Sequence, residues 1–360
     1  MALPVAAEQA PPLAPAPEQA PPLASAPEQA LPPAPPSARR PPAQPALTPE
    51  QTESNRLATE GLQLLQRGDF DVATQKLQEA LQSDPNNVLA STFLGFLAFR
   101  NGEMDKARGY CQKAAEVSPN APLALLLLGR MNEVTGDVAK ALEFYARSAQ
   151  AGAASPTAQT DGGLAIAAHA HYLGSFLQRK AGNSAGALDS LDQTLRVFPK
   201  NVNAWYEKGQ VLAELSRPAE AVEAFDHALT DRGSWYAPEA WLYPIRRYLF
   251  LEENSHYWKA VALRKAGKLP EAAAELATLA PMVAARVGSE IAGSGDGAPL
   301  QVLEGEVDLS YYQTHLELAR IYSEMGQKGQ AVDTLRAYLR IDGLDATRTA
   351  QARELMRTVR

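Results

Sequence analysis

Residues 61–73 read GLQLLQRGDFDVA, residues 95–107 read GFLAFRNGEMDKA, and residues 129–141 read GRMNEVTGDVAKA. Each stretch begins with a glycine, has a second glycine seven positions later and an alanine twelve positions later, and the three begin 34 residues apart. Pro85 and Pro119 close the first two units. A period of this length, with small residues at fixed offsets, predicts stacked helix–turn–helix units and therefore an all-α fold.

The same spacing extends the pattern to about seven units. Ser175 replaces the first glycine in the fourth unit, and Ala260 and Ala319 replace it in the sixth and seventh. The predicted units are Ser54–Asn87, Val88–Ala121, Pro122–Ser155, Ala168–Asn201, Val202–Trp235, Glu253–Arg286 and Tyr312–Asp345. The predicted domains are a leader at 1–50, units one to three at 51–155, units four and five with an aromatic insertion at 156–252, units six and seven with a Gly-rich loop at 253–345, and a capping helix at 346–360.

The leader differs from the rest of the chain in composition. It holds 16 of the 27 prolines and no aromatic residue, so it lacks the side chains that build a core. Residues 8–17, 18–27 and 28–37 are imperfect copies of one ten-residue repeat, EQAPPLAPAP in the first copy. Because proline fixes φ and removes a backbone donor, we predict a disordered, extended segment. It is either a solubilising spacer or, with the RRPP at 39–42, a docking strip for a proline-binding groove.

Charge and cysteine content restrict the partners. The net charge is −7 and no dense Lys/Arg run is present, which argues against nucleic acid. The single cysteine, Cys111, falls where the second helix of a unit places a large packing residue, and we predict a buried thiol.

The chain contains no apolar stretch of about 18 residues, so we predict no membrane span. Met1–Ala7 does not form a complete signal peptide. The direct prediction is a cytoplasmic protein. A periplasmic or envelope location is the alternative if an export signal has been removed or missed.

Residues 203–229, NAWYEKGQVLAELSRPAEAVEAFDHAL, contain the fullest set of residues at fixed spacing. The set is Trp205, Gly209, Leu212, Ala221, Phe225 and Ala228. It resembles the tetratricopeptide repeat (TPR), and the resemblance covers roughly two-thirds of the chain. The resemblance implies a right-handed superhelix, in which small residues let two helices approach and large ones fill the space between adjacent units.

The resemblance also implies an inner, partner-binding face built from the first helix of every unit. By the family's spacing, inner residues lie three before, one after and four after the small residue. The predicted groove residues are Leu62, Phe96, Phe99, Arg130, Tyr172, Phe176, Arg179, Tyr206, Tyr257 and Arg264. Apolar groups facing a groove are typical of an interaction surface. The alternative is that the leader or the insertion covers these groups as core.

The Lys and Asn that grip chaperone tails in one TPR subclass are absent from the first unit, which has Ala58 and Leu62 at the required positions. Binding of chaperone tails is therefore not predicted.

The aromatic insertion interrupts the period between units five and six. It includes Trp235 and Trp241, with Arg246 and Arg247 among the rings. This composition is typical of an interaction hot spot. The other interpretation is a lengthened helix that packs its rings against the neighbouring units.

No catalytic or metal-binding pattern is legible. His169 and His171 are two positions apart and so lie on different sides of a helix, while His256 and His315 take the packing position that Trp205 holds in its unit. The GSGDG at 293–297 lacks the Gly-Lys-Ser/Thr that follows in a phosphate-binding loop. We therefore predict no cofactor, no metal and no enzymatic activity.

The predicted function is a non-enzymatic scaffold or adaptor that binds a protein partner's peptide or helix in the inner groove. The alternative is a structural subunit of a larger complex, self-associating as a homo-oligomer or built into a cell-envelope assembly.

Overall fold

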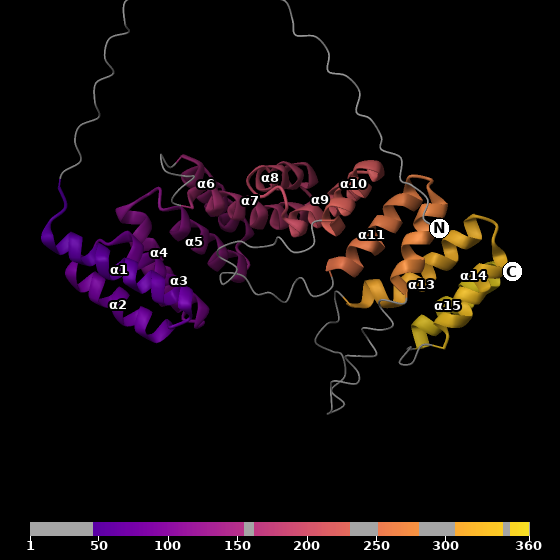
Figure 1. Cartoon of the computed structure of the whole chain (residues 1–360), viewed down its shortest axis with the longest axis horizontal. Coiled ribbons are helices and arrows are strands. Elements are labelled where there is room, and N and C mark those ends of the chain that lie inside the picture. Colours follow the sequence, from indigo (N-terminus) through magenta and orange to yellow (C-terminus); the bar gives the residue numbers. More distant parts are fainter. Residues whose placement is uncertain (1–45, 155–161, 231–250, 281–306, 341–345, 360) are drawn as a thin grey trace, which may run out of the picture. The chain divides into compact units, whose positions relative to one another are not determined.

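The computed structural model describes residues 46–154, 162–230, 251–280, 307–340 and 346–359. Within these ranges every regular element is a helix (Figure 1). The helices are α1 (Pro49–Arg67), α2 (Phe70–Ser83), α3 (Val88–Arg100), α4 (Met104–Val117), α5 (Pro122–Val134), α6 (Val138–Ala154), α7 (Gly163–Lys180), α8 (Ser184–Val197), α9 (Val202–Glu214), α10 (Pro218–Thr230), α11 (Leu251–Lys265), α13 (Val307–Glu324), α14 (Lys328–Tyr338) and α15 (Ala346–Val359). Residues 269–280 are also helical. The leader and most of the aromatic insertion lie outside the described residues.

Consecutive helices pack as pairs, which confirms the predicted all-α array of helix–turn–helix units. The pairs are α1 with α2, α3 with α4, α5 with α6, α7 with α8, α9 with α10, α11 with the helix at 269–280, and α13 with α14. The helix α15 packs against α14 and α13, where Ala352 and Val359 are buried. First helices of neighbouring units also adjoin, as α1 does with α3, α3 with α5, and α11 with α13. The first helices therefore share a continuous layer within these groups.

A left-handed residue ends the first helix of every unit. It lies seven positions after the small residue and is glycine in six units, with φ between 74° and 86°, and Ser216 in unit five, with φ of 57°. The next amide then donates back to the helix, as Asp69 N does to the Leu64 carbonyl at 3.0 Å. The left-handed backbone conformation favours glycine because a Cβ atom is crowded in that conformation. This requirement explains the second glycine of the period.

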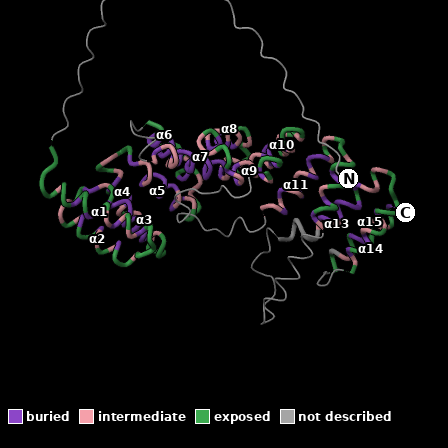
Figure 2. Tube along the Cα trace, viewed as in Figure 1, coloured by how far each residue is buried: buried purple, intermediate pink, exposed green. Residues whose placement is uncertain are grey.

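The small residue of each unit makes room for a large side chain from the second helix. A Cβ added at Gly209 would lie 2.6 Å from the Phe225 ring, and one at Gly129 would lie 2.6 Å from the Tyr145 ring. In all seven units the residue sixteen positions after the small residue is buried; these residues are Leu77, Cys111, Tyr145, Leu191, Phe225, Leu276 and Leu335. Buried positions accordingly follow the sides where neighbouring helices meet (Figure 2). The period thus records a close contact between two helices.

Hydroxyl groups join the open ends of three hairpins. Ser54 Oγ donates to the Ala80 carbonyl at 2.7 Å, Ser148 Oγ donates to the Pro122 carbonyl at 2.7 Å, and Thr194 Oγ1 donates to a carbonyl of α7 at 3.1 Å. The same two positions of the unit are linked each time, although the hydroxyl comes from either helix. These bonds tie the start of the first helix to the end of the second, and the Ala80 carbonyl also accepts from Asp84 N at 2.9 Å.

Candidate functional site

The predicted groove residues all lie on the first helices of the first six units. Three are buried: Phe96, Tyr172 and Tyr257 are 4%, 3% and 6% exposed, and each belongs to a hydrophobic cluster. These three contribute to the packed interior and not to an exposed binding surface. Their burial follows from position, because the first helix is enclosed by its own second helix and by its neighbours.

The remaining groove residues are half-buried. Leu62 and Phe99 pack with one side against the cluster that joins units one to three. Phe176 packs against the cluster of unit four, where its ring makes an edge contact with Tyr172 at 4.9 Å between centroids. Tyr206 packs in the same way in unit five. Side chains of this kind leave a partly exposed apolar strip, which we define as Leu62, Phe99, Phe176 and Tyr206.

Arg130 is the first charged residue among the predicted groove positions. Its Nη1 atom donates to Glu133 Oε2 at 2.6 Å, one turn further along α5. The same carboxylate accepts a hydrogen bond from the hydroxyl of Tyr145, the ring that fills the space beside Gly129. The core ring of unit three therefore holds the Arg130–Glu133 pair in place.

Arg179 joins units four and five. From α7, its Nε atom donates to Glu214 Oε1 at 2.7 Å, and its Nη1 atom donates to Glu207 Oε2 at 3.1 Å and also to Gln210. Burial lowers the pKa of Arg179, but Glu214 and Glu207 raise it by more, so the net shift is upward. We name this group the Arg179 cluster.

Arg264 repeats the arrangement between units six and seven. Its Nε atom donates to both carboxylate oxygens of Glu324 at 3.1 Å, and its Nη1 atom donates to Glu317. Glu317 is 5% exposed and also accepts from Arg320 at 3.0 Å. We name this group the Arg264 cluster.

The two clusters occupy equivalent positions in their units. In each, an arginine four residues after the small residue meets carboxylates that lie two before and five after the small residue of the next unit. The spacing in the sequence predicted that the arginines lie on the inner face, but it did not reveal these partners. The matching offsets of Glu207 and Glu317, and of Glu214 and Glu324, were the signal that could have revealed them.

His256 is more than the packing residue that we predicted. Its Nδ1 atom lies 2.7 Å from Glu275 Oε2, and Glu275 also contacts Lys259. Lys259 in turn pairs with Asp226 of the preceding unit at 2.8 Å. Burial raises the pKa of Glu275, yet His256 and Lys259 lower it by more, so the carboxylate is favoured. Units five and six are therefore also joined by charges.

Other single residues behave as packing groups. Cys111 is buried, as predicted, and burial raises the pKa of its thiol to about 12. His169 is buried near the Phe198 ring, at 5.8 Å between centroids. No group of three His, Cys, Asp or Glu side chains that could hold a metal occurs among the residues that the structure describes.

The insertion residues remain predictions. Trp235, Trp241, Arg246 and Arg247 lie outside the described residues, as does the GSGDG loop. No helix within the described ranges is long and apolar enough to cross a lipid bilayer.

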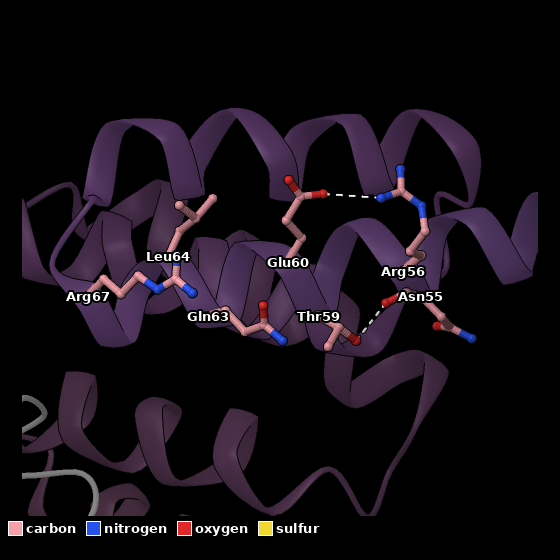
Figure 3. Close-up of a pocket in the computed structure, with 7 residues that line it drawn as sticks. All are labelled: Asn55, Arg56, Thr59, Glu60, Gln63, Leu64 and Arg67. Atoms are coloured by element: carbon pink, nitrogen blue, oxygen red, sulfur yellow. Dashed lines mark hydrogen bonds and ion pairs between the residues drawn. The ribbon is translucent and has the colours of Figure 1, made fainter.

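An open hollow of about 660 Å³ runs along one side of α1 (Figure 3). All its lining residues come from this single helix, and Arg56 pairs with Glu60 across it at 3.2 Å. We call this surface the α1 end face; it consists of Asn55, Arg56, Thr59, Glu60, Gln63, Leu64 and Arg67.

Comparison with the next two units explains the polarity of the α1 end face. Its central residues are Thr59, Glu60 and Gln63, and the matching residues one and two periods later are Phe93, Leu94 and Leu97, then Leu127, Leu128 and Met131. All six later residues are buried in the cluster that joins units one to three. The face of α1 that would meet a preceding unit is therefore polar, as expected for the end of a repeat array.

Sequence comparisons identify the repeats. Profiles of the tetratricopeptide repeat match residues 59–122, 112–156 and 177–238, and a second profile of the same repeat matches residues 312–343. These matches cover more than half of the chain, so the protein belongs to the tetratricopeptide repeat family. Members of this family generally act as non-catalytic scaffolds that bind other proteins. A comparison with curated proteins finds no match.

Several solved structures are similar to this chain, and the structure of PilF shows the same fold. PilF of Pseudomonas aeruginosa is 16% identical, with 64% of this chain and 92% of PilF covered at a TM-score of 0.50. MamA is 22% identical, with 50% and 91% covered at a TM-score of 0.38. YrrB, described as a TPR protein with an unusual peptide-binding site, is 15% identical, with 56% and 90% covered at a TM-score of 0.44. At these identities the likeness concerns the fold alone.

Proposed function

We propose that this protein is a non-enzymatic scaffold whose apolar strip binds a segment of a partner protein. The partly exposed strip supports the proposal most directly. Leu62 and Phe99 each rest one side on the shared cluster of units one to three, while the other side retains exposed surface. A partner segment laid across these helices would bury that surface, and burying apolar area stabilises association.

The position of the strip favours this function. The small residues and the large side chains opposite them already complete the contact within each unit, so Leu62 and Phe99 are not needed to close the hairpins. In units one to four, each first helix contacts the first helix of the next unit, which would allow one partner segment to contact several units. Binding along many units is typical of solenoid repeats.

The proposal is tested by partner capture with the full chain. The test variant is Leu62→Ser with Phe99→Ser, and the control is Val72→Ser with Val117→Ser, which changes exposed apolar residues of the second helices α2 and α4. We expect the test variant to lose the partners that the wild type and the control recover from the native host. Circular dichroism must show equal helicity for all three proteins. Unchanged recovery by a folded test variant would contradict the proposal.

The alternative, a subunit that assembles with copies of itself, receives no support from the α1 end face. Apolar residues would be expected where a further unit or copy stacked, yet Thr59, Glu60 and Gln63 are polar. End-to-end association through this face is therefore not favoured.

A further inference from the structure

In the two clusters, each nitrogen of the inner-face arginine already contacts a carboxylate of the neighbouring unit. In the Arg179 cluster, Nε and Nη2 contact Glu214 and Nη1 contacts Glu207. In the Arg264 cluster, Nε and Nη2 contact Glu324 and Nη1 contacts Glu317. All three nitrogens of each guanidinium group are thus engaged by the neighbouring unit.

Exchanging these carboxylates for one from a ligand would be unfavourable. Glu207 and Glu317 are 9% and 5% exposed, and displacing their arginine contacts would weaken the pairing of a carboxylate that has little access to water. Leaving a buried charge without its partner is strongly destabilising. The clusters therefore act as links between successive units rather than as grips for a partner.

The inner arginines of units three and seven are also paired with carboxylates. Arg130 pairs with Glu133, which is held by Tyr145, and Arg320 pairs with Glu317. Towards the start of the array, the predicted inner positions of units one and two carry no charged residue; they are Ala58, Leu62, Leu65, Thr92, Phe96 and Phe99. The strip is thus uncharged at one end and charge-compensated further along.

We propose that the apolar strip selects a partner segment by its apolar side chains, and that the segment supplies no carboxylate to the inner arginines. This inference rests on the proposed function and names the chemistry of the partner. The occupant is a segment of another protein with an uncharged, apolar face. Such a face is complementary to the strip, whose arginines are already paired with carboxylates. A charged face would lose its hydration there without gaining an unpaired charge of opposite sign.

The test uses peptides of twelve residues selected from a random library on the full-length protein. Each selected peptide is prepared with a free and with an amidated C-terminus, and its Kd is measured by fluorescence anisotropy at low and high salt. We expect enrichment in Leu, Phe, Trp and Met. Because ion pairs near a surface are screened by salt, an apolar contact should change its Kd by less than about twofold between roughly 50 and 500 mM NaCl.

The variants separate this inference from the proposed function. The double variant Leu62→Ser with Phe99→Ser should raise the Kd of the selected peptides at least about tenfold, whereas Val72→Ser with Val117→Ser should leave the Kd unchanged. Acidic peptides that bind about tenfold more weakly at high salt or after amidation would overturn the inference and leave the scaffold function standing. Peptides that bind the folded Leu62→Ser, Phe99→Ser protein as tightly as the wild type would overturn both. The salt and amidation measurements use the wild type, so they hold even if the variant is unstable.

Discussion

Exchanging the contact pair of one unit for that of another tests how the small residue and its large partner determine the packing. In unit five the pair is Gly209 and Phe225, whereas unit six has Ala260 and Leu276 in one buried cluster. The single variants Gly209→Ala and Phe225→Leu should each destabilise the protein. The double variant recreates the pair that unit six already contains and should restore stability.

The magnitudes follow from the geometry. A Cβ at Gly209 would lie 2.6 Å from the ring of Phe225, which is fully buried. Overpacking costs about 1–3 kcal/mol, and the better helix propensity of alanine returns about 1 kcal/mol. We therefore expect Gly209→Ala to cost about 1 kcal/mol, and Phe225→Leu to cost about 1–2 kcal/mol because it leaves a gap beside the glycine. The double variant should lie within about 0.5 kcal/mol of the wild type, a favourable coupling of about 2 kcal/mol.

Urea denaturation followed by circular dichroism measures these effects. Repeat arrays need not unfold in one step, so midpoints and slopes are both compared among the four proteins. Gly109→Ala is the matched control: a Cβ at Gly109 would meet no atom within 4 Å, and the change should stabilise α4 by up to about 1 kcal/mol. If the destabilisation of the double variant equals the sum of the two single destabilisations, the proposed coupling between the two side chains is refuted.

Three further predictions concern other parts of the array. Ser216→Gly should stabilise the protein by about 0.5–1 kcal/mol, because Ser216 holds the left-handed turn that glycine holds in the other units; an unchanged urea midpoint would contradict this. Replacing the three central residues of the α1 end face by Phe, Leu and Leu, as in α3, should make the apparent mass in light scattering rise with concentration, and a variant that stays at the wild-type mass would argue against a polar cap. The hydrogen bond from Arg264 lowers the pKa of Glu324 from its usual 4.5. The ion pair therefore stabilises the folded protein above pH 4.5, and this stabilisation is lost as the pH falls through the lowered pKa. The gap in denaturation midpoint between the wild type and Arg264→Gln should therefore narrow at acid pH, and a gap that widens would count against the ion pair.

The periodic features of the fold were predictable from the sequence. Gly61 allows a close contact between two helices, whereas Gly68 forms a left-handed turn. Both roles are met most easily by small residues. Burial of Cys111 followed from its place in the same period. Because these requirements are local and repeat along the chain, one unit predicts the next.

The candidate site was predicted less well, because its residues depend on neighbours that are distant in sequence. Arg179 and Arg264 were placed on the right helices, but their partners lie 28 and 53 residues away. Phe96 and Phe176 both lie one residue after the small residue of their units, yet Phe96 is buried and Phe176 is half-buried; Tyr172 and Tyr206, both three residues before it, differ in the same way. Position within one helix does not reveal how much of a side chain the adjacent helices cover.

The sequence by itself determined the helix–turn–helix period, the turns that end the first helices and the large side chains that meet the small ones, since each follows from the steric limits of a short segment. Only the tertiary structure decided that the inner arginines link successive units, that three of the predicted groove residues belong to the core, and that α1 presents a polar end. The physical reason is that exposure and charge pairing are properties of surfaces brought together by folding, and the same residue can face a partner or a neighbouring helix depending on what packs beside it.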